Sequence, residues 1–288
     1  MNNVQIWDLI DVLDEALIED IQEGDHTTLA TIDPDALGTA RLLVKEHGIL
    51  AGVELAEHIL KHVSPELEVD VVIPDGARVE PGDVAFLAHG RVQALLVAER
   101  TMLNFMQRMS GIATRTNQFV QAVRHTQARI LDTRKTTPGL RAFEKWAVRI
   151  GGGHNHRFGL YDMILIKDNH IDFCGGIEAA INRVLQYLHD NELDLRIEVE
   201  TRSLDDVQHV LKTGRVHRIM FDNFPLDRLR EGVAMVGKQV ETEASGGVNL
   251  QTVQAIAETG VDFISVGELT HSVKSLDLSF KAVIGQNS

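Results

Sequence analysis

The sequence predicts an α/β protein whose second part is a parallel sheet curved into a barrel. From about residue 128 onward, six short apolar runs alternate with segments of helix length, and this alternation is typical of parallel strands with crossover helices. The last four runs end at residues 200, 222, 244 and 266, a constant step of 22 residues. A uniform step gives each unit an equivalent place around an axis. It therefore favours a closed barrel, shorter than the eight-stranded one.

The first part of the chain has a mixed pattern. Apolar residues at helical spacing predict amphipathic helices, β-branched and partly alternating stretches predict strands, and the turn residues after Pro74 and Pro81 separate short units. The predicted elements are a helix over 4–21, strands over 39–45, 68–73 and 84–88, and a helix over 92–123 interrupted at Ser110 and Gly111.

In the second part, each apolar run predicts a strand, and each longer segment between two runs predicts a helix. The six strands are expected to end at Asp132, Lys167, Glu200, Asp222, Ala244 and Val266. Helices are expected over 176–188, 204–212, 226–236 and 250–259.

Polar residues gather at the expected carboxyl ends of these strands. Basic residues follow the first two strands, acids close the next two, and glycine loops follow the last two. In α/β barrels the active site forms at this rim, because all the βα loops meet there. Helix caps would explain one or two of these residues but not the whole series.

Composition narrows the possible partners. The net charge of −14 argues against nucleic acid and anionic lipid. No apolar run reaches the ~18 residues that span a bilayer, and the first 15 residues lack the pattern of a signal peptide. Cys174 is the one cysteine, so no internal disulfide is possible. We therefore expect a cytoplasmic protein.

One basic segment stands out in this acidic chain. Residues 133–161 hold six basic residues and one acid. Several of the basic residues sit at strand and loop ends rather than at helical spacing, which favours a site for a small, highly charged anion over a solvated helix face.

Two glycine loops, SGGV (245–248) and VGELTHS (266–272), follow the last two strands. Backbone N–H groups there can approach a phosphate, and these are the usual phosphate loops of barrel enzymes. Glu200 and Asp222 should face a common centre, where they can hold ribose hydroxyls, Mg²⁺ with its waters, or a developing cation. Glu198 points to the same strand face as Glu200, deeper in the barrel.

The segment GGGHNHRFG (151–159) contains an H-x-H pair, His154 and His156, that by itself is compatible with zinc. The flanking Arg149 and Arg157 oppose a cation, so we favour an anion site built from Arg, Lys and His donors. His170 is equally well explained as a structural histidine.

The sequence closely resembles the quinolinate phosphoribosyltransferase family over essentially the whole chain. The matching segments are GDHTT (24–28), ERTMLNFMQRMSGIAT (99–114), DTRKTTPGLRAFEKWAV (132–148), GGGHNHRFGLYDMILIKDNH (151–170), IEVE (197–200), MFDN (220–223), ASGGV (244–248) and SVGELTHS (265–272).

The resemblance implies an N-terminal α/β sandwich domain over 1–112, to which the tail 273–288 returns, and an open α/β barrel of seven strands over 113–272. This is the fold of a type II phosphoribosyltransferase. It also implies a homodimer, or an assembly of dimers, in which Arg100 serves the active site of the neighbouring subunit.

The implied reaction joins quinolinate to 5-phosphoribosyl 1-pyrophosphate (PRPP) with Mg²⁺, giving nicotinate mononucleotide, pyrophosphate and CO2 for NAD biosynthesis. The carboxylates of quinolinate would bind Arg134, His156, Arg157, Lys167 and the partner's Arg100. Ser245, Gly246, Gly247, Val266, Gly267 and Glu268 would bind the 5′-phosphate, Lys135 the pyrophosphate, and Glu200 and Asp222 the ribose and Mg²⁺. Thr133 joins the substrate-binding set, and Lys135, Lys167, Glu200 and Asp222 form its catalytic core.

Two alternatives remain at this stage. One is a related transferase for another heteroaromatic acid, of the kind associated with molybdenum uptake; the other is a non-catalytic sensor of a phosphate ligand. The basic residues argue against the first and the paired acids against the second. Glu268 stands where a small residue is expected, so its carboxylate should point away from the phosphate loop.

Overall fold

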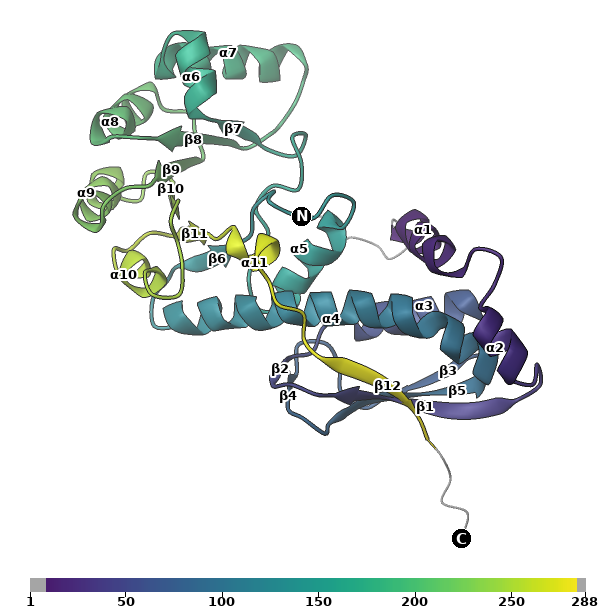
Figure 1. Ribbon diagram of the computed structural model, residues 1–288. Coiled ribbons are helices and arrows are strands. Elements are labelled where there is room, and N and C mark those ends of the chain that lie inside the picture. Colours follow the sequence, from purple (N-terminus) through teal and green to yellow (C-terminus); the bar gives the residue numbers. More distant parts are fainter. Residues whose placement is uncertain (1–8, 284–288) are drawn as a thin grey trace. The chain divides into compact units, whose positions relative to one another are not determined.

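The computed structural model describes residues 9–283, which form two compact units (Figure 1). The first unit contains residues 9–117, 137–152 and 272–283, and the second contains residues 118–136 and 153–271. Family resemblance predicts a different division, at residue 112, and that boundary stays a prediction. No helix among the described residues is long and apolar enough to cross a membrane.

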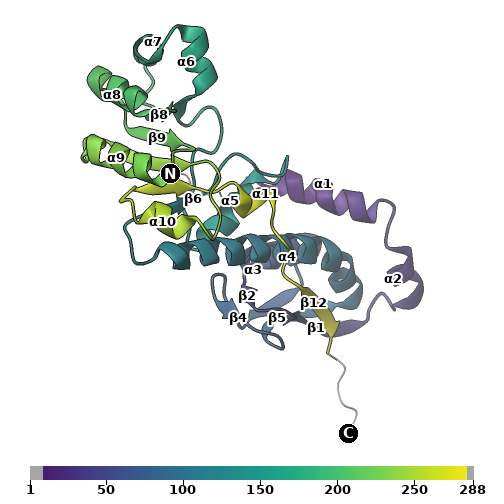
Figure 2. The same cartoon turned by 60° about the vertical axis from the view of Figure 1, so that its left-hand side comes forward.

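The first unit is built on a four-stranded antiparallel sheet of order β12-β1-β5-β3, with a two-stranded ribbon of β2 and β4. Its strands are β1 (Leu37–Val44), β2 (Gly48–Ile49), β3 (Glu68–Val71), β4 (Arg78–Val79), β5 (Val84–Arg91) and β12 (Leu278–Ala282). Its helices are α1 (Ile10–Ile21), α2 (His26–Thr31), α3 (Val53–Val63), α5 (Arg141–Ile150) and most of α4 (Val92–Val123). Helices α3 and α4 lie on one side of the sheet (Figures 1 and 2).

The strands predicted in this region are present, with β3 ending at Val71 rather than residue 73. The helix predicted over 4–21 begins at Ile10, and residues 4–8 lie outside the described part of the chain. The edge strand β12 comes from the far end of the sequence. Its Phe280 faces Leu42 of β1 in register, and both side chains are buried in the core of the unit.

The predicted interruption of the long helix at Ser110 and Gly111 is wrong, because α4 runs unbroken from Val92 to Val123. Ser110 instead uses its hydroxyl to accept the Ala51 N–H at 2.9 Å and to donate to the Ala51 carbonyl at 3.1 Å. Gly111 leaves room for the backbone of Lys274, whose carbonyl oxygen a methyl group at 111 would overlap. The two residues are needed for close packing against these segments, and the helix continues through both of them.

We expect Gly111→Ala to destabilise the first unit by about 1–3 kcal/mol, because the added methyl overpacks the contact with Lys274. An ordinary Gly→Ala change inside a helix has the opposite sign, a gain of about 1 kcal/mol. Denaturation followed by tryptophan fluorescence measures the effect, since helix α5 of this unit carries Trp146. Asn104→Ala, at an exposed position of the same helix, is the matched control. A stabilised Gly111→Ala variant would contradict the prediction.

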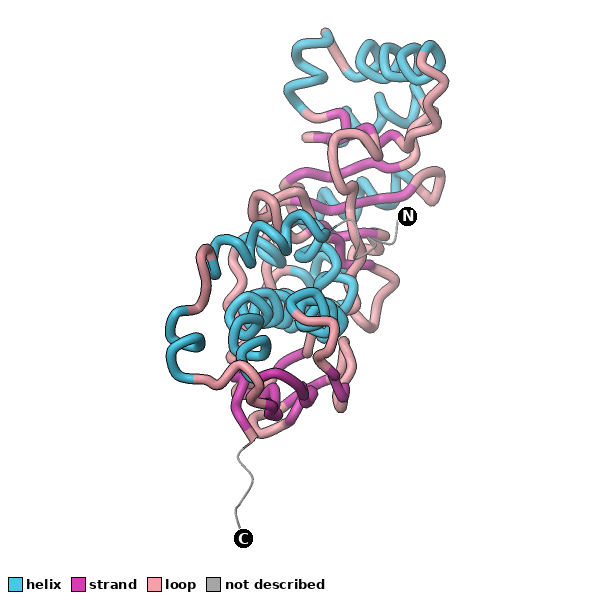
Figure 3. The backbone as a smooth tube through the Cα atoms, turned by 90° about the vertical axis from the view of Figure 1, so that its right-hand side faces the viewer, coloured by secondary structure: helices cyan, strands magenta, loops and turns pink. Residues whose placement is uncertain are grey.

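The second unit contains a six-stranded parallel sheet of order β6-β11-β10-β9-β8-β7, whose strands stack as a ladder in Figure 3. Its strands are β6 (Arg129–Leu131), β7 (Ile164–Ile166), β8 (Ile197–Thr201), β9 (Arg218–Asp222), β10 (Glu241–Ser245) and β11 (Phe263–Ser265). Its helices are α6 (Asp168–Cys174), α7 (Ile177–Asp190), α8 (Leu204–Thr213), α9 (Leu226–Val236), α10 (Val253–Ala257) and α11 (Glu268–His271). All six predicted strands and the four predicted helices are present.

The closed barrel that the uniform spacing favours does not form. No ladder joins β6 to β7 among residues 9–283, so each remains an edge of the sheet. Beyond β6 lies a single parallel bridge between Leu131 and His154, where the His154 N–H donates to Ile130 at 2.8 Å. This bridge marks a further, very short strand. The structure is therefore an open α/β barrel, as the family resemblance implies.

Candidate active site

The site lies at the carboxyl edge of the parallel sheet. Because neighbouring strands are parallel, their carboxyl ends meet along one edge. The predicted residues of the second unit all lie there: Thr133, Arg134 and Lys135 after β6, His156 and Arg157 after the His154 bridge, Lys167 after β7, Glu200 and Asp222 in β8 and β9, Ser245 to Gly247 at the end of β10, and Val266 to Glu268 after β11. Arg100 belongs to the first unit, where its side chain is exposed on α4.

Two arginines form the basic part of this edge. Arg134 is half-buried, and its Nε has no hydrogen-bond partner in the described residues. Burial lowers the pKa of Arg157, and the nearby positive charge of Arg134 lowers it further. Arg157 donates one bond, from Nη1 to the Met163 carbonyl at 3.2 Å. Two partly desolvated guanidinium groups beside one another are stabilised by an anion that each can bind in a bidentate way.

Beneath them lies a group of four ionisable side chains, His156, Glu198, Arg218 and Glu243, which we call the buried charge cluster. The two carboxylates are 0% exposed. His156 Nε2 lies 3.0 Å from Glu198 Oε2 and 3.5 Å from Glu243 Oε2. Arg218 Nη1 donates to Glu243 Oε2 at 2.7 Å. Such charges are stable inside a protein only when paired.

The pairing sets where the protons lie. Burial raises the pKa of Glu198 and the charge of Glu243 raises it further, to about 7. Burial would lower the pKa of His156, but Glu243 and Glu198 outweigh that effect and raise it to about 9. The Arg157 N–H donates to His156 Nδ1 at 2.7 Å, and Nε2 is the ring nitrogen that faces the two carboxylates.

Glu198, His156 and Glu243 also have the spacing of a metal site, with ligand atoms within 4.8 Å of one another. The Arg218 guanidinium already supplies positive charge to Glu243 at 2.7 Å. A metal ion would have to bind against that charge, so the cluster is better described as an ionic network.

Asp132 holds the histidine loop against the sheet. This residue is 0% exposed. Its carboxylate accepts the His156 N–H at 2.9 Å and the Asn155 side-chain amide at 2.6 Å. Sequence reasoning used Asp132 only as a strand end. It also missed Glu243 and Arg218, although Glu243 lies two residues before Ser245 and so shares its strand face, as Glu198 shares that of Glu200.

Glu200 and Asp222 form the acidic part of the edge. Burial raises the pKa of Glu200; Lys167 lowers it and the negative charge of Asp222 raises it again. Lys167 Nζ lies 3.9 Å from Glu200 Oε2. Two carboxylates that repel each other are a donor set of hard oxygens, the kind that Mg²⁺ binds together with phosphate oxygens.

The glycine loops provide the remaining surface. Gly246 and Gly247 have φ values of 88° and 63°, which favour glycine and turn the chain sharply after β10. At Gly267 the Lys135 side chain passes so close that an added Cβ would lie 3.1 Å from its Cδ. The Thr270 hydroxyl donates to the Lys135 carbonyl at 2.8 Å. Lys135 is thereby held beside the second glycine loop, where Glu268 begins α11.

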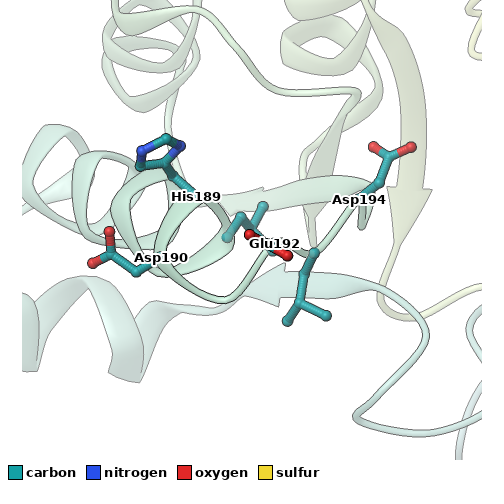
Figure 4. A pocket seen from close by; sticks show the side chains of 6 residues that line it. His189, Asp190, Glu192 and Asp194 are labelled. Atoms are coloured by element: carbon teal, nitrogen blue, oxygen red, sulfur yellow. The ribbon is translucent and has the colours of Figure 1, made fainter.

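Two further features, His170 and a hollow at the end of α7, are not part of the candidate site. His170 Nδ1 accepts the Lys167 N–H at 2.9 Å at the start of α6, which is the structural role considered for it. A hollow at the end of α7 is lined by Leu188, His189, Asp190, Glu192, Leu193 and Asp194. It precedes β8, at the opposite edge of the sheet from the site, and its polar side chains point in different directions (Figure 4).

Comparison with known proteins adds to this geometry. Residues 25–110 match the model of the quinolinate phosphoribosyl transferase N-terminal domain, and residues 112–281 match that of the C-terminal domain. Quinolinate phosphoribosyltransferase [decarboxylating] 1b of Nicotiana tabacum is 48% identical over 96% of this chain and 82% of that protein. The chloroplastic nicotinate-nucleotide pyrophosphorylase [carboxylating] of Arabidopsis thaliana is 48% identical over 96% and 83%. The crystal structure of NadC from Streptococcus pyogenes is similar with a TM-score of 0.92, at 35% identity, over 99% of this chain and 100% of that one.

Proposed function

Because this chain belongs to the quinolinate phosphoribosyltransferase family, we propose that its strand-end site binds quinolinate at the basic part and PRPP at the acidic and glycine-rich parts. The enzyme transfers the phosphoribosyl group of PRPP to quinolinate with decarboxylation. The products are nicotinate mononucleotide, pyrophosphate and CO2, in NAD biosynthesis.

The observation that carries the acceptor assignment is the pair Arg134 and Arg157. Quinolinate has two adjacent carboxylates, and a dianion of this kind relieves the repulsion between two neighbouring guanidinium groups. Lys167 adds a point charge at the same edge. His156 is buried, with Nδ1 accepting a backbone N–H and Nε2 facing carboxylates, so we assign it to the floor of this half-site.

PRPP takes the other half. The Ser245–Gly247 and Val266–Glu268 loops are suited to its 5′-phosphate, and Lys135 to its pyrophosphate. Glu200 and Asp222 are suited to the ribose hydroxyls and to Mg²⁺, which would neutralise charge on the departing pyrophosphate. Glu268 is half-buried at the first position of α11, and we keep the proposal that its carboxylate points away from the phosphate.

In the proposed reaction the pyridine nitrogen attacks the anomeric carbon as pyrophosphate leaves, through an oxocarbenium-like state. The positive charge on the quaternary ring nitrogen then stabilises the electron pair that stays on ring C2 when the 2-carboxylate departs as CO2, and C2 takes up a proton from water. Neither step needs a protein nucleophile. Positioning of the two substrates, which contributes ~7–11 kcal/mol in favourable cases, and electrostatic stabilisation therefore account for the acceleration.

We also propose a homodimer, or an assembly of dimers, in which Arg100 completes the acceptor site of the neighbouring subunit. Its exposed position on α4 in the first unit is compatible with that role. A cytoplasmic location is part of the proposal and rests on the single cysteine, Cys174. Some plant relatives carry a mitochondrial or chloroplastic designation in their names.

The function is tested by measuring CO2 and pyrophosphate released from PRPP and Mg²⁺ with quinolinate, and in parallel with nicotinate. We expect both products in the assay with quinolinate and neither in the assay with nicotinate. Release of pyrophosphate only in the assay with nicotinate would show that the acceptor is not quinolinate. No product from either would favour a transferase for a different acid or a ligand sensor.

We expect Asp222→Ala to raise the Mg²⁺ concentration needed for half-maximal rate and the KM for PRPP by roughly tenfold or more, because one charged oxygen donor is lost. The Kd for quinolinate should stay within about twofold of the wild-type value. Titration of the rate with Mg²⁺ at several PRPP concentrations measures the first effect. An unchanged Mg²⁺ dependence would count against the role assigned to Asp222.

A further inference from the structure

Asn223 lies between the two parts of the proposed PRPP site. We propose that it is a positioning residue that fixes the Asp222 carboxylate and the Ser245–Gly247 loop relative to each other, and so determines affinity for PRPP. The proposal rests on the proposed function of this edge.

The backbone of Asn223 is the first link. Asp222 and Ser245 are paired in the parallel ladder of β9 and β10. The Asn223 N–H donates to the Ser245 carbonyl at 2.8 Å, which extends the pairing by one bond beyond the end of β9. Asn223 has φ of 55°, in the left-handed region where asparagine is tolerated better than most residues with a Cβ. This turn sends the chain towards α9 and leaves the side chain beside the glycine loop.

The side chain is the second link. Asn223 Nδ2 donates to Asp222 Oδ2 at 2.9 Å. A carboxylate with one oxygen engaged by a neighbouring amide has restricted rotation about its Cβ–Cγ bond, and its other oxygen, Oδ1, is presented in a defined direction. An amide can hold the carboxylate in this way without adding a charge next to the phosphate loop.

Gly246 is the third link. A methyl group there would overlap Cγ, Oδ1 and Nδ2 of Asn223, so the amide rests directly on the Cα of Gly246. The glycine at 246 is therefore required twice, for its φ of 88° and for the space that Asn223 occupies. One side chain contacts both the carboxylate assigned to the ribose and Mg²⁺ and the loop assigned to the 5′-phosphate.

The test is Asn223→Gly, because glycine suits a φ of 55° and leaves the turn intact while removing the amide. We expect the KM for PRPP to rise about tenfold, as for loss of one well-placed hydrogen bond. The Kd of quinolinate, measured by calorimetry on the full chain, should stay unchanged, and the melting temperature should not fall. Lys238→Gly is the matched control, since Lys238 is an exposed residue with φ of 67° just after α9.

The alternative is that Asn223 serves only the turn. In that case Asn223→Gly binds PRPP like the wild type, and the proposal is overturned. Equal losses of PRPP and quinolinate affinity with a lower melting temperature would also overturn it, because they indicate general disruption. A wild-type enzyme that binds neither compound would instead refute the proposed function, independently of the variants.

A double-mutant cycle with Gly246→Ala gives a second readout. In the wild-type background the added methyl displaces the Asn223 amide, so the KM for PRPP should rise. In the Asn223→Gly background that amide is absent, and Gly246→Ala should have a clearly smaller effect. Additive effects of the two substitutions would contradict the coupling.

Discussion

Arg134→Ala should weaken quinolinate binding by roughly 30-fold to a few thousand-fold, the equivalent of about 2–5 kcal/mol for removing one side of a desolvated charge pair. The reason is the partly buried guanidinium, whose Nε has no hydrogen-bond partner in the described residues and whose charge acts on Arg157. The Kd of quinolinate by titration calorimetry is the direct measurement. PRPP affinity should be largely preserved.

Arg157→Ala should weaken quinolinate binding in the same way. It should also lower thermal stability more than Arg134→Ala does, because the Arg157 charge interacts with the buried Glu198. Arg228→Ala is the matched control, since Arg228 pairs with Glu231 on the surface of α9 and its side chain is 58% exposed. Normal quinolinate affinity in both site variants would contradict the acceptor assignment.

Glu243→Ala should destabilise the second unit by about 3–5 kcal/mol, because it leaves Arg218 without its closest counter-charge in a buried place. Trp146 belongs to the first unit, so its fluorescence is a poor reporter of the second. Amide hydrogen exchange of β9 and β10 measures the local free energy of opening directly. Glu258→Ala, which removes an exposed partner of His125, is the control.

Replacing both charges tests the cause of that loss. Arg218→Met combined with Glu243→Leu should cost less than Glu243→Ala alone, since it leaves no guanidinium that has lost its buried partner and keeps only the more exposed Glu241. A double variant that is less stable than the single one would show that the loss comes from removing the ion pair and not from leaving one charge without its partner. A loss below about 1 kcal/mol for Glu243→Ala would contradict burial as the cause.

The six strands of the second unit were predictable because each is a short apolar run with a polar residue at its end. Hydrophobic patterning and a step of 22 residues are local properties of the sequence. Closure of the sheet is not local. It depends on whether β6 and β7 meet, and the spacing of the runs does not determine this.

The same distinction applies to the site. Residues after a strand end, such as Arg134 and Lys167, are placed by the strand alone. Arg218 and Glu243 lie inside strands, where an alternating charge is as compatible with solvent as with a buried partner. The register decides this, because it puts Arg218 opposite Glu198 of β8 and Glu241 of β10. Glu243, two residues after Glu241, is then close enough to pair with Arg218. Ser110 and Gly111 suggested a helix break because the contacts that require small residues there are distant in sequence. Ser110 bonds to Ala51, and Gly111 packs against the backbone of Lys274.

The position of β12 has a consequence for how the protein is made. This strand supplies an edge of the first sheet, yet its residues 278–282 follow the second unit in the sequence. The whole second unit, 118–136 and 153–271, is synthesised before them. Domains generally fold as units during synthesis, so the second unit can mature while β1 still has an unpaired edge. An unpaired edge is a site for wrong association, and the nascent chain is therefore vulnerable to aggregation until β12 emerges.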